Sequence, residues 1–232
     1  MPFNLAIFKT RALSAVVFAA VMVGGMLWNG WSFLILFTII HFGCWYEYIR
    51  LLKKASPEAF RRYGILGVFY ITVPVLLMLY ISIVHPDSKP GNDLLFFHYS
   101  PILPCGIIFS IWINDTMAYL VGSFIGRTPF SNISPKKTWE GTAGGAILCV
   151  IVISWLGWFL QYYTVIDWVC ISAICAVFGT LGDLFESKLK RLAHIKDSGS
   201  IMPGHGGFLD RFDSFLVATP FVWLYIKFFI HG

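Results

Sequence analysis

The chain has 232 residues, of which 57% are hydrophobic and 12% are charged, and its formal net charge is +5. This is about half the charge of an ordinary soluble domain, and a soluble fold of this size could not bury so much apolar surface. A soluble globular protein is therefore excluded, and the bilayer is expected to surround most of the chain. The five scattered cysteines match neither a disulfide framework nor a zinc site.

Seven apolar segments are long enough to cross a bilayer, because a crossing helix takes about 20 residues. The first segment could be mistaken for a secretory signal, but no small-x-small cleavage pattern follows it cleanly, and Trp28 and Trp31 resemble interfacial anchors. The sequence thus predicts an all-α integral membrane protein with about seven transmembrane helices. They are expected near residues 12–28, 31–49, 63–84, 101–125, 142–161, 165–186 and 213–230.

The distribution of positive charge predicts the orientation of these helices. If the N-terminus is cytoplasmic, the 17 lysines and arginines all fall on the cytoplasmic side except Lys89 and Lys227. Such an excess is what the positive-inside rule requires. Two long polar loops, 126–141 and 187–212, then face the cytoplasm.

Four acids gather at the cytoplasmic ends of the last two spans. Asp183 and Glu186 are one helical turn apart and share a face, and Asp210 and Asp213 have the same spacing. If the two spans pack together, these carboxylates converge at the membrane boundary, where they are costly unless paired or metal-bound. Because oxygen ligands suit Mg²⁺, the cluster is a candidate metal site. The alternative is that the acids only pair with nearby cations, namely Lys188, Lys190, Arg191 and Arg211.

A glycine-rich turn, Pro203-Gly204-His205-Gly206-Gly207, lies between these pairs of acids. Its glycines allow positive φ and let backbone N–H groups approach a ligand closely. Followed by a helix that starts near Phe208, the turn predicts a cradle for phosphate oxygens, to which His205 would also donate. A re-entrant turn that uses glycine only for packing is the alternative.

A second polar stretch starts inside the fourth span with Asn114-Asp115. An ionisable residue at this depth is expected to face a polar cavity. The loop that follows contains Lys136-Lys137 but lacks the Walker A spacing. The two lysines could hold a triphosphate or only enforce the orientation, and Trp139 could stack on a base or anchor at the interface.

Both polar stretches resemble the phosphatidate cytidylyltransferases, integral membrane enzymes that make CDP-diacylglycerol from CTP and phosphatidate. The run SKLKRLAHIKDSGSIMPGHGGFLDRFD, Ser187 to Asp213, follows the signature of that family, with Met202 as a conservative departure. The block N-D-x-x-A-Y-x-x-G-x-x-x-G-R from Asn114, followed by S-P-K-K-T-W-E-G from Ser134, also resembles the family. Two matching stretches in the right order are far more specific than one.

The resemblance implies transfer of a cytidylyl group from CTP to phosphatidate, with Mg²⁺ (one or two ions) as the cofactor. It places the metal-binding acids of the family at Asp183 and Asp210, with Glu186 and Asp213 as further candidate ligands. Lys196 and Arg211 are expected to act with these acids in catalysis. The residues expected to hold the nucleotide are Lys136, Lys137, Thr138, Trp139, Arg191, His205, Gly206 and Gly207.

The resemblance also divides the chain into a lipid-facing scaffold of transmembrane helices, 1–100, and a catalytic transmembrane region, 101–232. The expected partners are CTP, phosphatidate and the bilayer, with no nucleic acid, and in a bacterium the location would be the inner membrane. The small residues at 141–146 could pack helices within or between protomers, which leaves a homodimer open. Rival functions are a CTP-dependent polyprenol kinase, a cytidylyltransferase for another lipid phosphate, and an ion-coupled transporter.

Overall fold

The computed structural model describes residues 5–83, 99–131, 133–199 and 206–230. Within these ranges it contains helices and no strand, apart from an isolated bridge between Pro129 and Thr138, so the predicted all-α fold is confirmed. The elements are α1 (Leu5–Leu27), α2 (Gly30–Ala55), α3 (Pro57–Tyr63), η1 (Val68–Thr72), α4 (Val73–Ile83), α5 (Ile102–Ile125), α6 (Trp139–Leu160), α7 (Val165–Leu192), α8 (Leu209–Tyr225) and η2 (Ile226–Ile230).

Each of the seven predicted spans overlaps a helix of the structure. Two of them, the first and the third, correspond to shorter apolar helices, Ala12–Leu27 and Val68–Ile83. Among the described residues, five helices are long and apolar enough to cross a membrane by length and composition: Gly30–Ala55, Ile102–Ile125, Trp139–Leu160, Val165–Leu192 and Leu209–Ile230. The chain is therefore a multi-pass helical membrane protein.

Three of the long helices, α2, α6 and α7, begin at a side chain that caps their free N–H groups. Asn29 accepts from Ser32 N at 2.8 Å to start α2, and Thr164 and Asp167 form the same reciprocal box at the start of α7. Thr138 accepts from Gly141 N at 3.1 Å and starts α6. Helix α8 is different, because its N-cap residue Phe208 offers no side-chain acceptor. Its first amides need acceptors from elsewhere in the chain.

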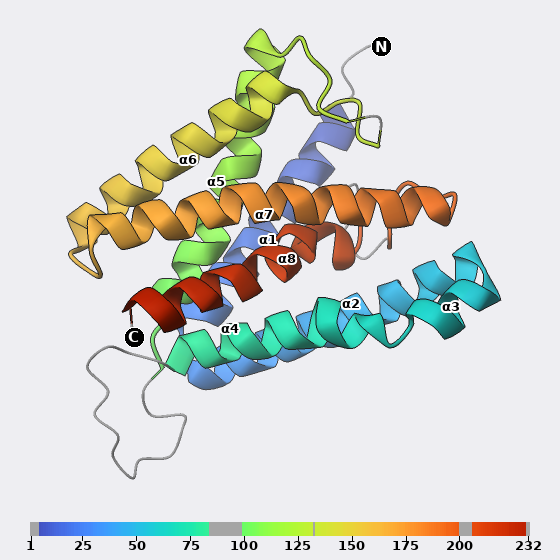
Figure 1. The fold of residues 1–232 in the computed structure, drawn as a ribbon, viewed down its shortest axis with the longest axis horizontal. Helices are drawn as coiled ribbons and strands as arrows, with labels where there is room; N and C mark the ends of the chain where they lie inside the picture. Colours follow the sequence, from blue (N-terminus) through green and yellow to red (C-terminus); the bar gives the residue numbers. More distant parts are fainter. Residues whose placement is uncertain (1–4, 84–98, 132, 200–205, 231–232) are drawn as a thin grey trace.

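Helix α8 lies between α7 on one side and α2 and α4 on the other (Figure 1). On the α2 side, the rings of Phe37 and Phe215 are fully buried, with centroids 5.6 Å apart. On the α7 side the backbones approach closely, since a Cβ at Gly182 would collide with the backbone of Asp213. The start of α8 is thus held by helices from both halves of the chain.

Helices α5 and α6 form a second close pair, with the connecting loop 126–138 at one end (Figure 1). A Cβ at Gly141 or Gly145 would collide with the backbone of Ala118 in α5. The glycines of the 141–146 stretch therefore pack this helix against its neighbour in the same chain. This contact places the loop beside the end of α7, where the predicted acids lie.

Candidate active site

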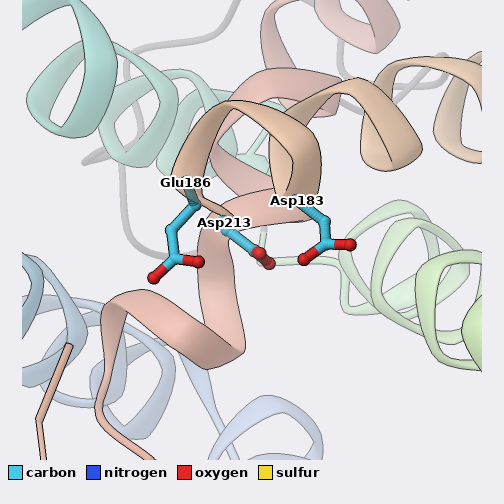
Figure 2. Close-up of side chains that lie close together, drawn as sticks. All are labelled: Asp183, Glu186 and Asp213. Atoms are coloured by element: carbon cyan, nitrogen blue, oxygen red, sulfur yellow. The ribbon is translucent and has the colours of Figure 1, made fainter. Parts of the chain in front are cut away.

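Three of the four predicted acids converge where α7 meets α8. Asp183 and Glu186 come from α7 and Asp213 comes from α8, and one carboxylate oxygen of each lies within 4.8 Å of the others. Figure 2 shows Asp213 between the two side chains of α7. The spacing argument is confirmed for these three acids, which we call the acid cluster. Asp210 is not a member of this group, because its carboxylate is engaged elsewhere.

Two members of the acid cluster, Asp183 and Asp213, line a polar cavity of about 680 Å³. Asp183 forms an ion pair with Lys137, which reaches the cavity from the loop between α5 and α6. Asp213 is buried, with an exposed fraction of 6%, and in the described part of the chain no cation pairs with it. The other charged side chains that line the cavity are Asp115, Lys136, Asp210 and Arg211.

Asp210 is held by donors on all sides. Its Oδ2 accepts from Ser198 N at 2.9 Å and from Gly207 N at 2.8 Å, and the hydroxyl of Ser198 lies 2.9 Å away. Its Oδ1 accepts from Lys190 Nζ at 2.7 Å. These bonds tie Ser198 and Gly207, which lie before and at the end of the glycine-rich turn, to the first turn of α8.

Lys190 connects Glu186 of the acid cluster to Asp210. Its Nζ lies 2.5 Å from Oε2 of Glu186 and 2.7 Å from Oδ1 of Asp210. Glu186 is completely buried, so this ion pair offsets part of the cost of removing its charge from water. The alternative of simple pairing with cations thus describes Asp210 and Glu186 better than it describes Asp213.

The acceptor that α8 lacks comes from Glu47 in α2, a residue that the sequence reasoning missed. Its Oε1 accepts from Phe208 N and its Oε2 from Leu209 N, both at 2.9 Å. Ser198 Oγ donates to the same Oε2 at 2.6 Å. Glu47 is buried, with an exposed fraction of 4%, and in the described residues no cation pairs with it. The N-terminal N–H groups and the dipole of α8 stabilise its charge instead.

These two carboxylates explain three glycines of the signature. A Cβ at Gly199 or at Gly207 would occupy the space of the Glu47 carboxylate, and a Cβ at Gly206 would collide with Asp210. Gly206 also has a φ of +84°, which favours glycine. The amides of Gly207, Phe208 and Leu209 donate to carboxylates, so a phosphate cradle here would have to use other groups.

The loop after α5 is closed by its own hydrogen bonds. Glu140, in the first turn of α6, accepts from Arg127 N at 3.1 Å and from the side chain of Thr128 at 2.8 Å. Phe130 N donates to the carbonyl of Lys137 at 2.7 Å, beside the Pro129–Thr138 bridge. These hydrogen bonds therefore fix the loop in a position where Lys136 and Lys137 line the cavity.

The other predicted site residues divide into two groups. Thr138 lines the cavity along with the two lysines before it, and Arg211 lines it from α8. Trp139 is exposed and packs on Phe130 with centroids 4.4 Å apart, away from the cavity lining. Arg191 and Lys196 are exposed and do not line the cavity either, and His205 lies outside the described residues.

A signal for Glu47 was present in the sequence. It is the only acid within the apolar segment 31–49, and an ionisable residue at membrane depth is a functional hypothesis by default. The same argument was applied to Asp115, which lines the polar cavity as expected. Nothing in the sequence pairs Glu47 with Ser198, because 151 positions separate them.

Comparison with known proteins shows which family the chain resembles. Residues 99–229 match the model of the cytidylyltransferase family. A phosphatidate cytidylyltransferase of Rickettsia bellii is 32% identical over 230 residues, 96% of this chain and 90% of that protein. The phosphatidate cytidylyltransferase of Bacillus subtilis is 46% identical over 121 residues, 51% of this chain and 45% of its own. A chloroplastic homologue of Arabidopsis thaliana, phosphatidate cytidylyltransferase 5, is 42% identical over 129 residues, 55% of this chain and 31% of its own.

Proposed function

Because the chain belongs to the cytidylyltransferase family, we propose that it transfers the cytidylyl group of CTP to phosphatidate, giving CDP-diacylglycerol and pyrophosphate. The observation that carries the proposal is the polar cavity, which collects carboxylates from α7 and α8 and cations from a separate loop. A cavity of about 680 Å³ is in the size range of small-molecule sites. Carboxylates and cations side by side suit a metal–triphosphate substrate.

The chemistry needs no protein nucleophile. A phosphate oxygen of phosphatidate attacks the α-phosphorus of CTP in line, the new P–O bond forms, and the bond to pyrophosphate breaks. The protein then has to align the two substrates and balance their negative charge. Lys136, Lys137 and Arg211 line the cavity and are the side chains placed to bind phosphate oxygens.

Asp183 and Asp213 are the proposed ligands for Mg²⁺, with Glu186 beside them. Their donor set fits the ion, which prefers carboxylate oxygen and usually completes its shell with water and substrate phosphate. The fit is supported by Asp213, whose buried carboxylate has no cationic partner in the described ranges. When bound, Mg²⁺ would neutralise phosphate charge and stabilise the departing pyrophosphate.

For Asp210 we propose a role in holding the site together. Its oxygens are occupied by Lys190, Ser198 and Gly207, so a metal would have to compete with these donors. Arg191, in the last turn of α7, and Lys196, in the segment that follows it, are both exposed. We propose that they attract the nucleotide and the lipid phosphate from a distance.

We further propose seven membrane crossings with the N-terminus in the cytoplasm and, in a bacterium, a place in the inner membrane. The support is the charge asymmetry of the sequence and a helix at each predicted span. In this orientation the cavity meets the cytoplasm, where CTP is, at the depth where the headgroup of a membrane lipid lies. A water-soluble and a lipid substrate can then react without either leaving its medium.

The test is pyrophosphate release by purified protein in detergent with Mg²⁺, CTP and phosphatidate, each omitted in turn. Release that requires all three, with CDP-diacylglycerol formed, is the expected result. Consumption of CTP with a polyprenol but not with phosphatidate would indicate a CTP-dependent polyprenol kinase instead. No nucleotide turnover with any lipid would overturn the proposal and favour a transporter.

A further inference from the structure

Glu47 joins the two halves of the molecule at the start of α8, which has no side-chain cap of its own. It lies in α2, outside the region 99–229 that matches the family model, yet its carboxylate accepts hydrogen bonds from Ser198, Phe208 and Leu209 of the signature run. We propose that Glu47 is a positioning residue for the reaction: it fixes the first turn of α8 and thereby aims Arg211 and Asp213 into the polar cavity. The inference rests on the proposed function for its effect on turnover.

The hydrogen bonds of Glu47 determine the register of α8. Phe208 N and Leu209 N each donate to a different oxygen of one carboxylate, so the helix start can neither rotate nor slide without losing a bond. Arg211 and Asp213 follow within about one helical turn of these amides, and both line the cavity. A displacement at the cap is therefore transmitted directly to the side chains that face the substrates.

Ser198 extends the same restraint to the segment that precedes the glycine-rich turn. Its hydroxyl lies 2.6 Å from Oε2 of Glu47 and 2.9 Å from Oδ2 of Asp210, and its amide also donates to Asp210. The two carboxylates and this hydroxyl form one buried hydrogen-bonded unit. A buried polar network of this kind holds a single geometry only while every member is satisfied.

Glutamate is required here because the site has donors only. Two backbone amides and a hydroxyl point at Glu47, and a carboxylate accepts from all of them. A glutamine would turn its NH₂ group towards at least one donor and lose that bond. An aspartate keeps the charge but is one methylene shorter, so it would reach only part of the set.

The first experiment compares Glu47→Gln and Glu47→Asp with wild type in detergent. We expect kcat to fall on the order of 10²-fold in Glu47→Gln, the usual cost of misplacing catalytic groups by about 1 Å. The KM for CTP should change less than kcat, because Lys136 and Lys137 come from another loop, and Glu47→Asp should recover part of the loss. Normal kcat in a folded Glu47→Gln protein would overturn the inference.

A matched control is available at the opposite end of α7. Asp167 caps that helix through Thr164 N at 3.0 Å and also accepts from Tyr225 at 2.9 Å, far from the cavity. Asp167→Asn should lower the thermal unfolding midpoint and leave kcat within about twofold, as expected for a lost cap without a catalytic consequence. If both variants lost turnover only in proportion to unfolded protein, Glu47 would be a structural cap and not a positioning residue.

Gly207 provides a second test that does not rely on removing the carboxylate alone. Gly207→Ala places a methyl group in the space of the Glu47 carboxylate, so it should break the same contact. The double variant Glu47→Ala/Gly207→Ala should then lose no more turnover than the worse single variant, because both changes remove one interaction. Losses that multiply would show that the two residues act separately and would contradict the inference.

Hydrogen exchange separates this inference from the proposed function. The amides of Phe208 and Leu209 should exchange at least tenfold faster in Glu47→Gln, while those at the start of α7 stay protected. This readout does not require turnover. Faster exchange in a protein that proves inactive on CTP would remove the proposed function and keep the positioning role, whereas unchanged exchange would overturn the positioning role itself.

Discussion

Two pairs of carboxylates within one small region of the molecule are treated in opposite ways. Glu47 and Asp210, the anchored carboxylates, are surrounded by backbone N–H groups, a hydroxyl and Lys190. Asp183, Asp213 and also Asp210 line the polar cavity. We call Asp183 and Asp213 the cavity carboxylates because between them the described residues supply one paired cation, Lys137. All four are acids at the same end of the helices, yet only the second pair is left able to bind something else.

This difference shows that acids of one sequence signature can have different tasks, one structural and one in binding. Asp210 and Asp213 are one helical turn apart in the same motif, so the sequence treats them as equivalent. Burial with saturated hydrogen bonds indicates a structural task, because adding a ligand would cost existing bonds. Burial beside a polar cavity without a cationic partner makes an acid a candidate ligand for a bound cation.

The largest effect is expected from Asp213→Asn, which removes a charge from the cavity and leaves the shape. We expect turnover to fall on the order of 10³-fold, the upper end for loss of one electrostatic stabiliser. The thermal unfolding midpoint should not fall, because a buried charge with no cationic partner in the described ranges is removed. Pyrophosphate release and thermal unfolding in the same detergent provide both measurements.

The Mg²⁺ dependence of the same variant gives its control. The Mg²⁺ concentration for half-maximal residual turnover should rise in Asp213→Asn and stay unchanged in Asp167→Asn, whose side chain lies in the cap of α7. Turnover within tenfold of wild type would remove Asp213 from the metal site and leave no basis for separating the two pairs.

The next largest effect is expected from Asp210→Asn, and its pattern should differ. An asparagine cannot accept from Ser198, Gly207 and Lys190 together, so the turn loosens and the charge of Lys190 loses a partner. Turnover should fall on the order of 10²-fold. The unfolding midpoint should also fall, because breaking a buried ion pair costs about 3 kcal/mol or more. A variant that lost turnover with unchanged stability would place Asp210 among the cavity carboxylates.

The sequence was sufficient for the helices and for the helix face that Asp183 and Glu186 share, whereas their meeting with Asp213 was predicted only on the condition that the two spans pack together. Apolar length predicts membrane helices because every backbone bond must be satisfied inside the segment. The i, i+3 spacing then puts the acids on facing sides once α7 and α8 are neighbours. Both inferences depend on local periodicity, which a sequence displays directly.

The sequence could not show which acceptor each backbone N–H group near the start of α8 would find. The glycine turn was predicted to cradle phosphate, since amides near a helix start commonly bind anions. At the amides of Gly207, Phe208 and Leu209, the acceptors in the structure are Glu47 and Asp210 of the chain itself. Glu47 comes from an apolar helix far away in sequence, so only the packing of α2 against α8 reveals it.

An intermediate effect is expected from Lys137→Gln. This lysine pairs with Asp183 and lines the cavity, so its loss removes one charged contact to the triphosphate and one partner of an acid. A hydrogen bond to a charged group contributes about 1.5–3 kcal/mol, which corresponds to roughly a 10- to 150-fold decrease in kcat/KM. Steady-state kinetics at varied CTP measures it.

Lys136→Gln is the matched comparison for that variant. Lys136 lines the same cavity from the next position but forms no ion pair within the described residues. It should raise the KM for CTP and leave kcat close to wild type. Equal losses of kcat in the two lysine variants would show that the ion pair with Asp183 contributes nothing to turnover. Asp183 would then be distinguished only by its place in the cavity.

The smallest effect is expected from Lys53→Ala/Lys54→Ala, at the end of the helix that carries Glu47. Both lysines are exposed, and Lys53 lies 5.1 Å from the ring of Phe60, a contact with an energy of about 0.5–1 kcal/mol at an exposed site. Turnover should stay within about twofold, because neither side chain reaches the cavity or the start of α8. A tenfold loss would mean that the N-terminal half affects the reaction through the cationic surface of α2, and not through the hydrogen bonds of Glu47 to the start of α8.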